Sequence, residues 1–308
     1  MMNLKKYGAK LISIIFFDNE VVYKYSQEEI YMKITEIIKD AFLFPSKNSG
    51  GYAIYLLLSV LIALFALGGA ITYAFGIFNG ENYLIGGLYF IVSLIIGILI
   101  EGYHISVIRT GIKHEERIPV FDLFENFMTG FDNLVVLIAY YLIPTLIVAL
   151  VGLDTDIFGK GIAVVQEFLL QMFNVYIMGG SVNIAANAIS NVLSTFVDSL
   201  VITITVGLIL FVIFSIIRSM AESRLANTGS LKEALNIYES LRDIKRIGVG
   251  KVIVVPLLVI VLITIIEIIL TILLNNYPFL LTTFCILITP YFVLVTQRAL
   301  GLLYSDIA

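Results

Sequence analysis

Long stretches without a charged residue alternate along the chain with short segments in which charges gather. The charge-free stretches cover residues 48–80, 82–100, 133–153, 199–217 and 268–297. A sixth stretch, 252–273, is interrupted by Glu267 alone. A helix needs about 20 apolar residues to cross the ~30 Å hydrocarbon core of a bilayer. The pattern therefore predicts six membrane spans, at about 51–75, 83–107, 134–153, 200–217, 252–273 and 279–295.

Composition supports this interpretation. Of the 308 residues, 59% are apolar and 14% are charged, and the mean hydropathy is +1.00. Soluble domains carry about 25% charged residues, so this chain has too few polar side chains to cover a soluble globule of its size. Inside a bilayer, a helix satisfies all of its backbone hydrogen-bonding groups locally. The fold class that we predict is all-α, a polytopic membrane helix bundle with additional amphipathic helices at the interface.

Basic residues are distributed very unevenly among the segments that connect the spans. The segments 1–50, 108–132, 218–251 and 296–308 hold 18 of the 19 lysines and arginines, whereas Lys160 alone lies in the alternate set. Lysine and arginine accumulate on the cytoplasmic side of membrane proteins. We therefore expect a multi-pass protein of the cell membrane with both termini in the cytoplasm.

The domain organisation follows from the same pattern. Residues 1–31 form an N-terminal extension, and residues 32–308 form the six-span membrane domain. Two capping boxes in basic segments, Asp122 with Glu125 and Ser230 with Glu233, predict short amphipathic helices at the cytoplasmic interface. We expect the second helix to dock on the bundle or the bilayer through the face that carries Leu235.

The long outer segment, about 154–199, has the pattern of an amphipathic hairpin. Residues 158–173 have apolar positions at helical spacing, Gly179 and Gly180 break the pattern, and residues 182–200 carry a polar stripe with a period near 3.6. The stripe includes Asn183, Asn187 and Asn191. These side chains either line a polar path or face water from an interfacial helix. The hairpin can rest on the leaflet, enter the membrane or cap a cavity.

Four ionisable residues fall within or near the predicted spans, namely Glu101, His104, Glu267 and Arg298. Such groups are costly in a membrane and are candidates for functional sites by default. Arg298 is expected at the same depth as Glu101. The structural interpretation is a contact between Glu101 and either Arg298 or His104, and the functional one is that Glu101 serves a ligand or an ion.

The remaining residue chemistry argues against several classes of function. No serine or cysteine has a base at a recognisable spacing, and no glycine-rich phosphate loop follows a strand. Cys285 and two histidines are too few for a usual zinc site, and the net charge of −4 does not suit nucleic acid. We predict no enzymatic activity, no cofactor, no metal and no nucleic-acid partner. The expected partners are the lipid bilayer and either a specific lipid or another membrane protein.

Several segments resemble a known family. They are Ala41-Phe42-Leu43-Phe44-Pro45 before the first span, Ile118-Pro119-Val120-Phe121 after the second, Arg224-Leu225-Ala226-Asn227-Thr228-Gly229-Ser230, and Arg298-Ala299-Leu300-Gly301 near the end. Together they resemble an archaeal family of six-span membrane proteins, frequent in methanogens and catalogued as a domain of unknown function. The resemblance covers most of 32–308. It implies membrane localisation and topology, and it assigns no activity and no site residues.

A more remote likeness is to the bacterial membrane domains that accompany glycerophosphodiester phosphodiesterases, whose catalytic domain has no counterpart in this sequence. Two function classes follow from these observations. The first is a non-catalytic scaffold, accessory subunit or lipid-organising membrane component. The alternative is a small transporter or channel-like permease that uses the polar hairpin and Glu267.

Overall fold

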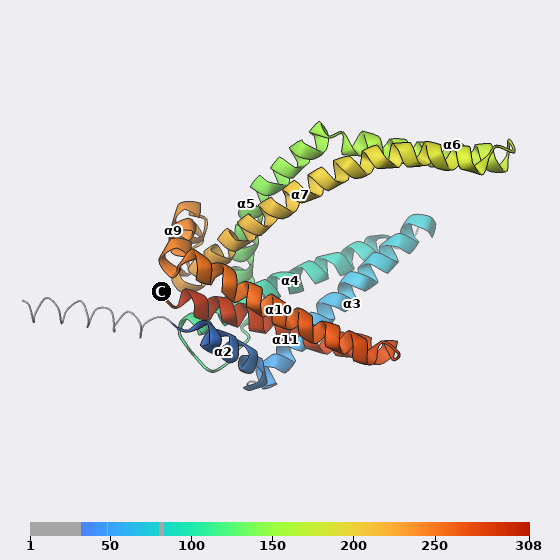
Figure 1. The fold of residues 1–308 in the computed structure, drawn as a ribbon. Helices are drawn as coiled ribbons and strands as arrows, with labels where there is room; N and C mark the ends of the chain where they lie inside the picture. The colour runs from blue at the N-terminus through green and yellow to red at the C-terminus, as the bar shows by residue number, and fades with distance from the viewer. Residues whose placement is uncertain (1–31, 48, 80–82) are drawn as a thin grey trace, which may run out of the picture. The chain divides into compact units, whose positions relative to one another are not determined.

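The computed structural model describes residues 32–47, 49–79 and 83–308, and its secondary structure within these ranges is helical, without a strand (Figure 1). The predicted extension 1–31 lies outside the described residues. Among the described residues, six helices are long and apolar enough to cross a membrane: α3 (Ser49–Asn79), α4 (Tyr83–Ile112), α5 (Leu123–Asp154), α7 (Val182–Thr228), α10 (Val249–Leu274) and α11 (Pro278–Tyr304). The all-α fold class and the six apolar helices are confirmed.

The helices extend beyond the predicted spans, because a helix can continue where charged residues begin. α5 begins at Leu123 and includes the segment that was predicted as the first interfacial helix. The Asp122 carboxylate accepts a hydrogen bond from the Glu125 N–H at 2.8 Å. α7 joins the second half of the predicted hairpin to the fourth span in one helix of 47 residues. At 1.5 Å per residue it is about 70 Å long, more than twice the thickness of the hydrocarbon core.

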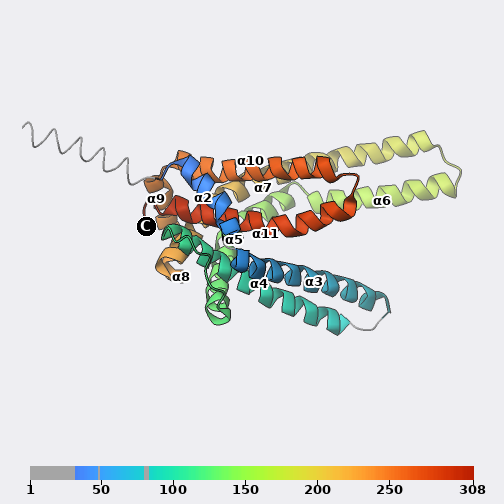
Figure 2. The same cartoon turned by 90° about the horizontal axis from the view of Figure 1, so that it is seen from below.

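The chain divides into two compact units. The core unit comprises the described residues up to Asn133 together with Glu222–Ala308, and the hairpin unit comprises Leu134–Ala221. In the core unit, α3 packs against α4, and α11 packs against α4, α10 and α2 (Ile34–Lys47). Figure 2 shows α10 and α11 running side by side.

Glycines allow α4 to approach two other segments of the core unit closely. A Cβ atom on Gly301 of α11 would overlap the carbonyl oxygen of Ile108, and Gly111 lies at the same crossing. At the crossing of α4 with the start of α5, a Cβ on Gly102 would overlap the carbonyl oxygen of Asn126. Small residues permit this backbone approach in membrane helices. These crossings set the register of the polar side chains around them.

The second predicted interfacial helix is interrupted. α8 (Leu231–Ala234) is one turn long, and α9 (Ile237–Ile247) begins after Asn236, whose side chain accepts a hydrogen bond from the Glu239 N–H. The Ser230 cap is present, since its hydroxyl accepts from the Glu233 N–H.

Most of the predicted apolar face of this segment is not buried against the protein, and its docking on the bilayer stays a prediction. Leu235 is exposed and Tyr238 is 74% exposed, whereas Asp243 is completely buried. The Arg224 guanidinium donates to the Asp243 carboxylate at 2.7 Å, and the Tyr304 hydroxyl donates to it at 2.9 Å. These partners offset the cost of burying the charge, so α9 packs through a face that combines Asp243 with the apolar residues Ile244 and Ile247.

In the hairpin unit, α5 and α6 (Ile157–Tyr176) follow one another alongside α7 (Figure 1). Asp156 lies between α5 and α6 in the left-handed region, at φ 51°. The Thr155 and Thr203 hydroxyls lie 3.3 Å apart and connect this corner to α7. Gly179, at φ 70°, lies in the turn between α6 and α7, where the sequence predicts the break in the hairpin.

Candidate functional site

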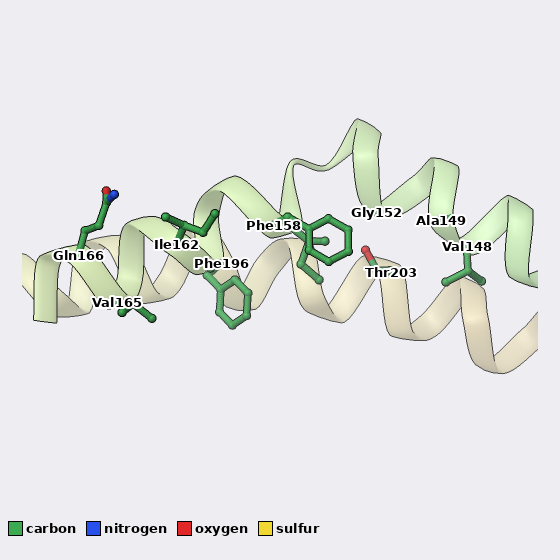
Figure 3. A pocket seen from close by; sticks show the side chains of 11 residues that line it. Val148, Ala149, Gly152, Phe158, Ile162, Val165, Gln166, Phe196 and Thr203 are labelled. Atoms are coloured by element: carbon green, nitrogen blue, oxygen red, sulfur yellow. The ribbon is translucent and has the colours of Figure 1, made fainter. Parts of the chain in front are cut away.

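A cavity of about 620 Å³ lies in the hairpin unit between α5, α6 and α7 (Figure 3). Its walls include Val148 and Gly152 of α5, Ile162 and Val165 of α6, and Phe196 of α7. The lining contains no charged side chain, and its polar side chains are those of Gln166 and Thr203. Ligand sites in proteins commonly enclose about 300–1,000 Å³ and are mostly apolar.

Small residues and the α5–α6 corner create the cavity. The glycines at positions 152 and 161 add no side chain to the space between the helices, and a Cβ on Gly161 would lie 3.3 Å from the Phe196 ring. The Thr203 hydroxyl donates to the Ser199 carbonyl oxygen at 2.8 Å, so it is already engaged. The cavity wall therefore favours a hydrocarbon chain as its ligand. Burying such a chain away from water is favourable and needs no hydrogen-bond partner in the wall.

Lys160 is held beside this cavity. Its ammonium donates hydrogen bonds to the Thr155 carbonyl oxygen at 2.8 Å and to the Ser199 hydroxyl at 2.6 Å. Ser199 is buried, and it lies three residues after Phe196 and four before Thr203, which places the three on one face of α7. The α5–α6 corner therefore holds Lys160 in place. Lys160 is the basic residue that lies in a different set of connecting segments from the other 18 lysines and arginines.

The predicted polar stripe lies on the surface of the hairpin unit. Asn183, Asn187 and Asn191 are all exposed, and none of them lines the cavity. The stripe therefore takes no part in the cavity, and that it faces water stays a prediction.

Glu101 and His104 lie in a hydrogen-bonded cluster of the core unit. The Glu101 carboxylate accepts from the Asn133 amide at 2.8 Å and lies 3.7 Å from the His104 Nδ1. The His104 Nε2 is 2.7 Å from the Tyr55 hydroxyl. The predicted contact between Glu101 and His104 is therefore present.

Arg298 belongs to a different cluster, at the end of α11. Its side chain is 1% exposed and donates to the Asp40 carboxylate at 2.8 Å and to the Glu115 carbonyl oxygen at 2.7 Å. The guanidinium also lies over the Phe44 ring, 4.4 Å from its centroid.

Of the two alternative contacts predicted for Glu101, the structure shows the one with His104. The expectation that Arg298 lies at the depth of Glu101 was wrong, and the close crossing of α4 and α11 explains why. Gly111 of α4 meets Gly301 of α11. Arg298 lies three residues before Gly301 and is therefore level with Ile108, three residues before Gly111. Glu101 lies ten residues before Gly111, and a difference of seven residues corresponds to about 10 Å along a helix. α2 supplies Asp40 at the correct depth instead.

The fourth predicted residue, Glu267, is exposed on α10 and takes no part in either cluster. Sequence reasoning missed Asn126 and Asn133, which are 2% and 1% exposed. Within the described part of the chain, the Asn126 Nδ2 and the Asn133 Oδ1 have no hydrogen-bond partner. Their spacing of seven residues, which places both on one face of α5, is the signal that could have found them.

The family model for "Protein of unknown function (DUF4013)" matches residues 85–275, which is more than half of the chain and includes the hairpin cavity. None of the curated proteins and none of the solved structures matches the chain. The archaeal origin and the likeness to phosphodiesterase-associated membrane domains remain predictions from the sequence.

Proposed function

We propose, from the premise that this chain belongs to the DUF4013 family, that it is a non-catalytic, lipid-organising membrane component whose hairpin unit holds a lipid chain. The apolar cavity between α5, α6 and α7 is the observation that carries this proposal. Its volume and uncharged walls suit a hydrocarbon chain better than a polar metabolite, which would need several convergent polar groups.

The position of the cavity along α7 supports the same function. Phe196 and Thr203 lie on either side of Leu200, close to where the charge-free stretch of the fourth span begins. A bilayer changes from hydrocarbon to head groups over such a boundary. A cavity at this level is within reach of a lipid that stays partly in the membrane.

Filling the cavity should displace the lipid. Ala149 lines the cavity and its neighbour Leu150 does not, so Ala149→Phe and Leu150→Phe form a matched pair on one helix. Displacing about two methylene groups, at ~0.8 kcal/mol each, should weaken binding roughly tenfold. Native mass spectrometry of the purified protein should detect lipid on the wild type and on Leu150→Phe, and much less on Ala149→Phe. Equal lipid on both variants would count against the proposal.

A small transporter is the second candidate, supported by the cluster that links Tyr55, His104, Glu101 and Asn133. Connected polar groups within a membrane can pass protons. This candidate would gain support from a proton flux into liposomes that Glu101→Gln abolishes.

We also propose that both termini lie in the cytoplasm, because of the 18-to-1 distribution of basic residues. In a Cys285→Ala background, cysteines placed at the exposed positions Lys113 and Lys232 should be shielded from an impermeant thiol reagent in intact cells. A cysteine at the exposed position Asn183 should react. The opposite labelling pattern would reverse the orientation.

A further inference from the structure

We propose that the ligand of the hairpin cavity is a lipid whose head group contains a phosphate, and that Lys160 binds that phosphate. This inference rests on the proposed function, because it assigns the head group of the lipid whose chain the cavity holds. It goes further by naming the chemical class of the lipid and the residue that recognises it.

The first support is the state of the Lys160 ammonium. A lysine carries three N–H donors, and the Thr155 carbonyl oxygen and the Ser199 hydroxyl engage two of them. No carboxylate among the described residues lies within ion-pair distance of the Lys160 Nζ. The charge is therefore held in place with one donor free and without an anionic partner.

The second support is the level at which Lys160 lies. Ser199, which holds the ammonium, immediately precedes Leu200, at the beginning of the charge-free stretch 199–217. Phospholipid phosphates lie at the edge of the hydrocarbon core rather than within it. A lipid with its chain against Val148 and Thr203 would have its head group near the corner that Lys160 occupies.

The third support concerns the charge of the head group. A charge-assisted hydrogen bond from an ammonium to a phosphate oxygen is shorter and stronger than one between neutral groups. Asp154, Asp156 and Asp198 are exposed near the same corner, and their charges oppose a head group with a large net negative charge. A zwitterionic phospholipid, in which a cation accompanies the phosphate, fits this combination better than a fatty acid.

The test compares two lipids with identical chains on the delipidated, full-length protein. Phosphatidylethanolamine carries the phosphate, and diacylglycerol lacks it. Titration followed by native mass spectrometry should give about tenfold tighter binding of phosphatidylethanolamine to the wild type, the scale of one charge-assisted hydrogen bond. Lys160→Met should remove this preference while leaving diacylglycerol binding unchanged. Lys160→Arg should keep the preference, and Lys232→Met, at an exposed lysine of α8, is the matched control.

The outcomes separate this inference from the proposed function. Equal binding of the two lipids to the wild type, or an unchanged preference in Lys160→Met, overturns the assignment of the phosphate to Lys160. Neither result contradicts the proposal that the cavity binds a lipid chain. Tighter binding of a fatty acid than of phosphatidylethanolamine also overturns it. Failure of the wild type to bind either lipid contradicts the proposed function itself. The wild-type comparison needs no variant, so a misfolded Lys160→Met protein would not leave the inference untested.

Discussion

Replacing Arg298 by methionine should lower the free energy of unfolding by about 1–3 kcal/mol, because it removes the buried donor of an ion pair and leaves its acceptors without a partner. The Arg298 side chain is 1% exposed, and its loss leaves the Asp40 carboxylate and the Glu115 carbonyl oxygen without their donor. Methionine has a similar length and fits an apolar environment, so the lost charge accounts for most of the effect. Unfolding in mixed detergent micelles measures the change.

Arg242 provides the control for this prediction. It forms an ion pair with Glu239 at 3.4 Å, but its side chain is 54% exposed. An exposed pair contributes at most about 1 kcal/mol, and often much less, so Arg242→Met should leave unfolding nearly unchanged. Similar losses in the two variants would show that Arg298 is not a buried structural anchor.

Gly102→Ala should destabilise the core unit by about 1–3 kcal/mol, or by more if the helices cannot separate. The added Cβ would overlap the Asn126 carbonyl oxygen, and a backbone atom of a neighbouring helix cannot rotate away as a side chain can. The α4–α5 crossing would have to open, which would also disturb the hydrogen bond between Asn133 and Glu101.

Gly87 offers a control of the opposite sign on the same helix. A Cβ at Gly87 would meet nothing within 4 Å, so Gly87→Ala gains the helix propensity of alanine, about 0.5–1 kcal/mol, without a clash. The same unfolding measurement should therefore move in opposite directions for the two alanines. A stabilising or neutral Gly102→Ala would contradict the close crossing.

The number and order of the apolar helices could be predicted from the sequence because charge and hydropathy are local properties. The exact ends could not, since α5 and α7 continue through polar segments once their backbone hydrogen bonds have begun. The Asp122 and Ser230 caps were predictable for the same local reason.

The side-chain clusters depend on how helices cross, and the sequence alone does not give that information. Arg298 and Asp40 are separated by 258 residues and meet because α2 packs against α11, whereas the Gly111–Gly301 contact places Arg298 away from the level of Glu101. The apolar cavity was missed for a related reason. The polar stripe that includes Asn187 marks one face of α7 in the sequence. The cavity instead forms where Phe196 and Thr203 of α7 face α5 and α6, and no sequence pattern indicates that arrangement.

Photo-crosslinking with a phospholipid that carries a diazirine near the end of one chain tests most directly whether the hairpin cavity holds a lipid chain. We predict that the label attaches mainly to peptides containing Val148 or Thr203, and that excess unlabelled lipid and Ala149→Phe both suppress it. Labelling spread over exposed surfaces of α3 and α10, and unchanged in Ala149→Phe, would contradict the account.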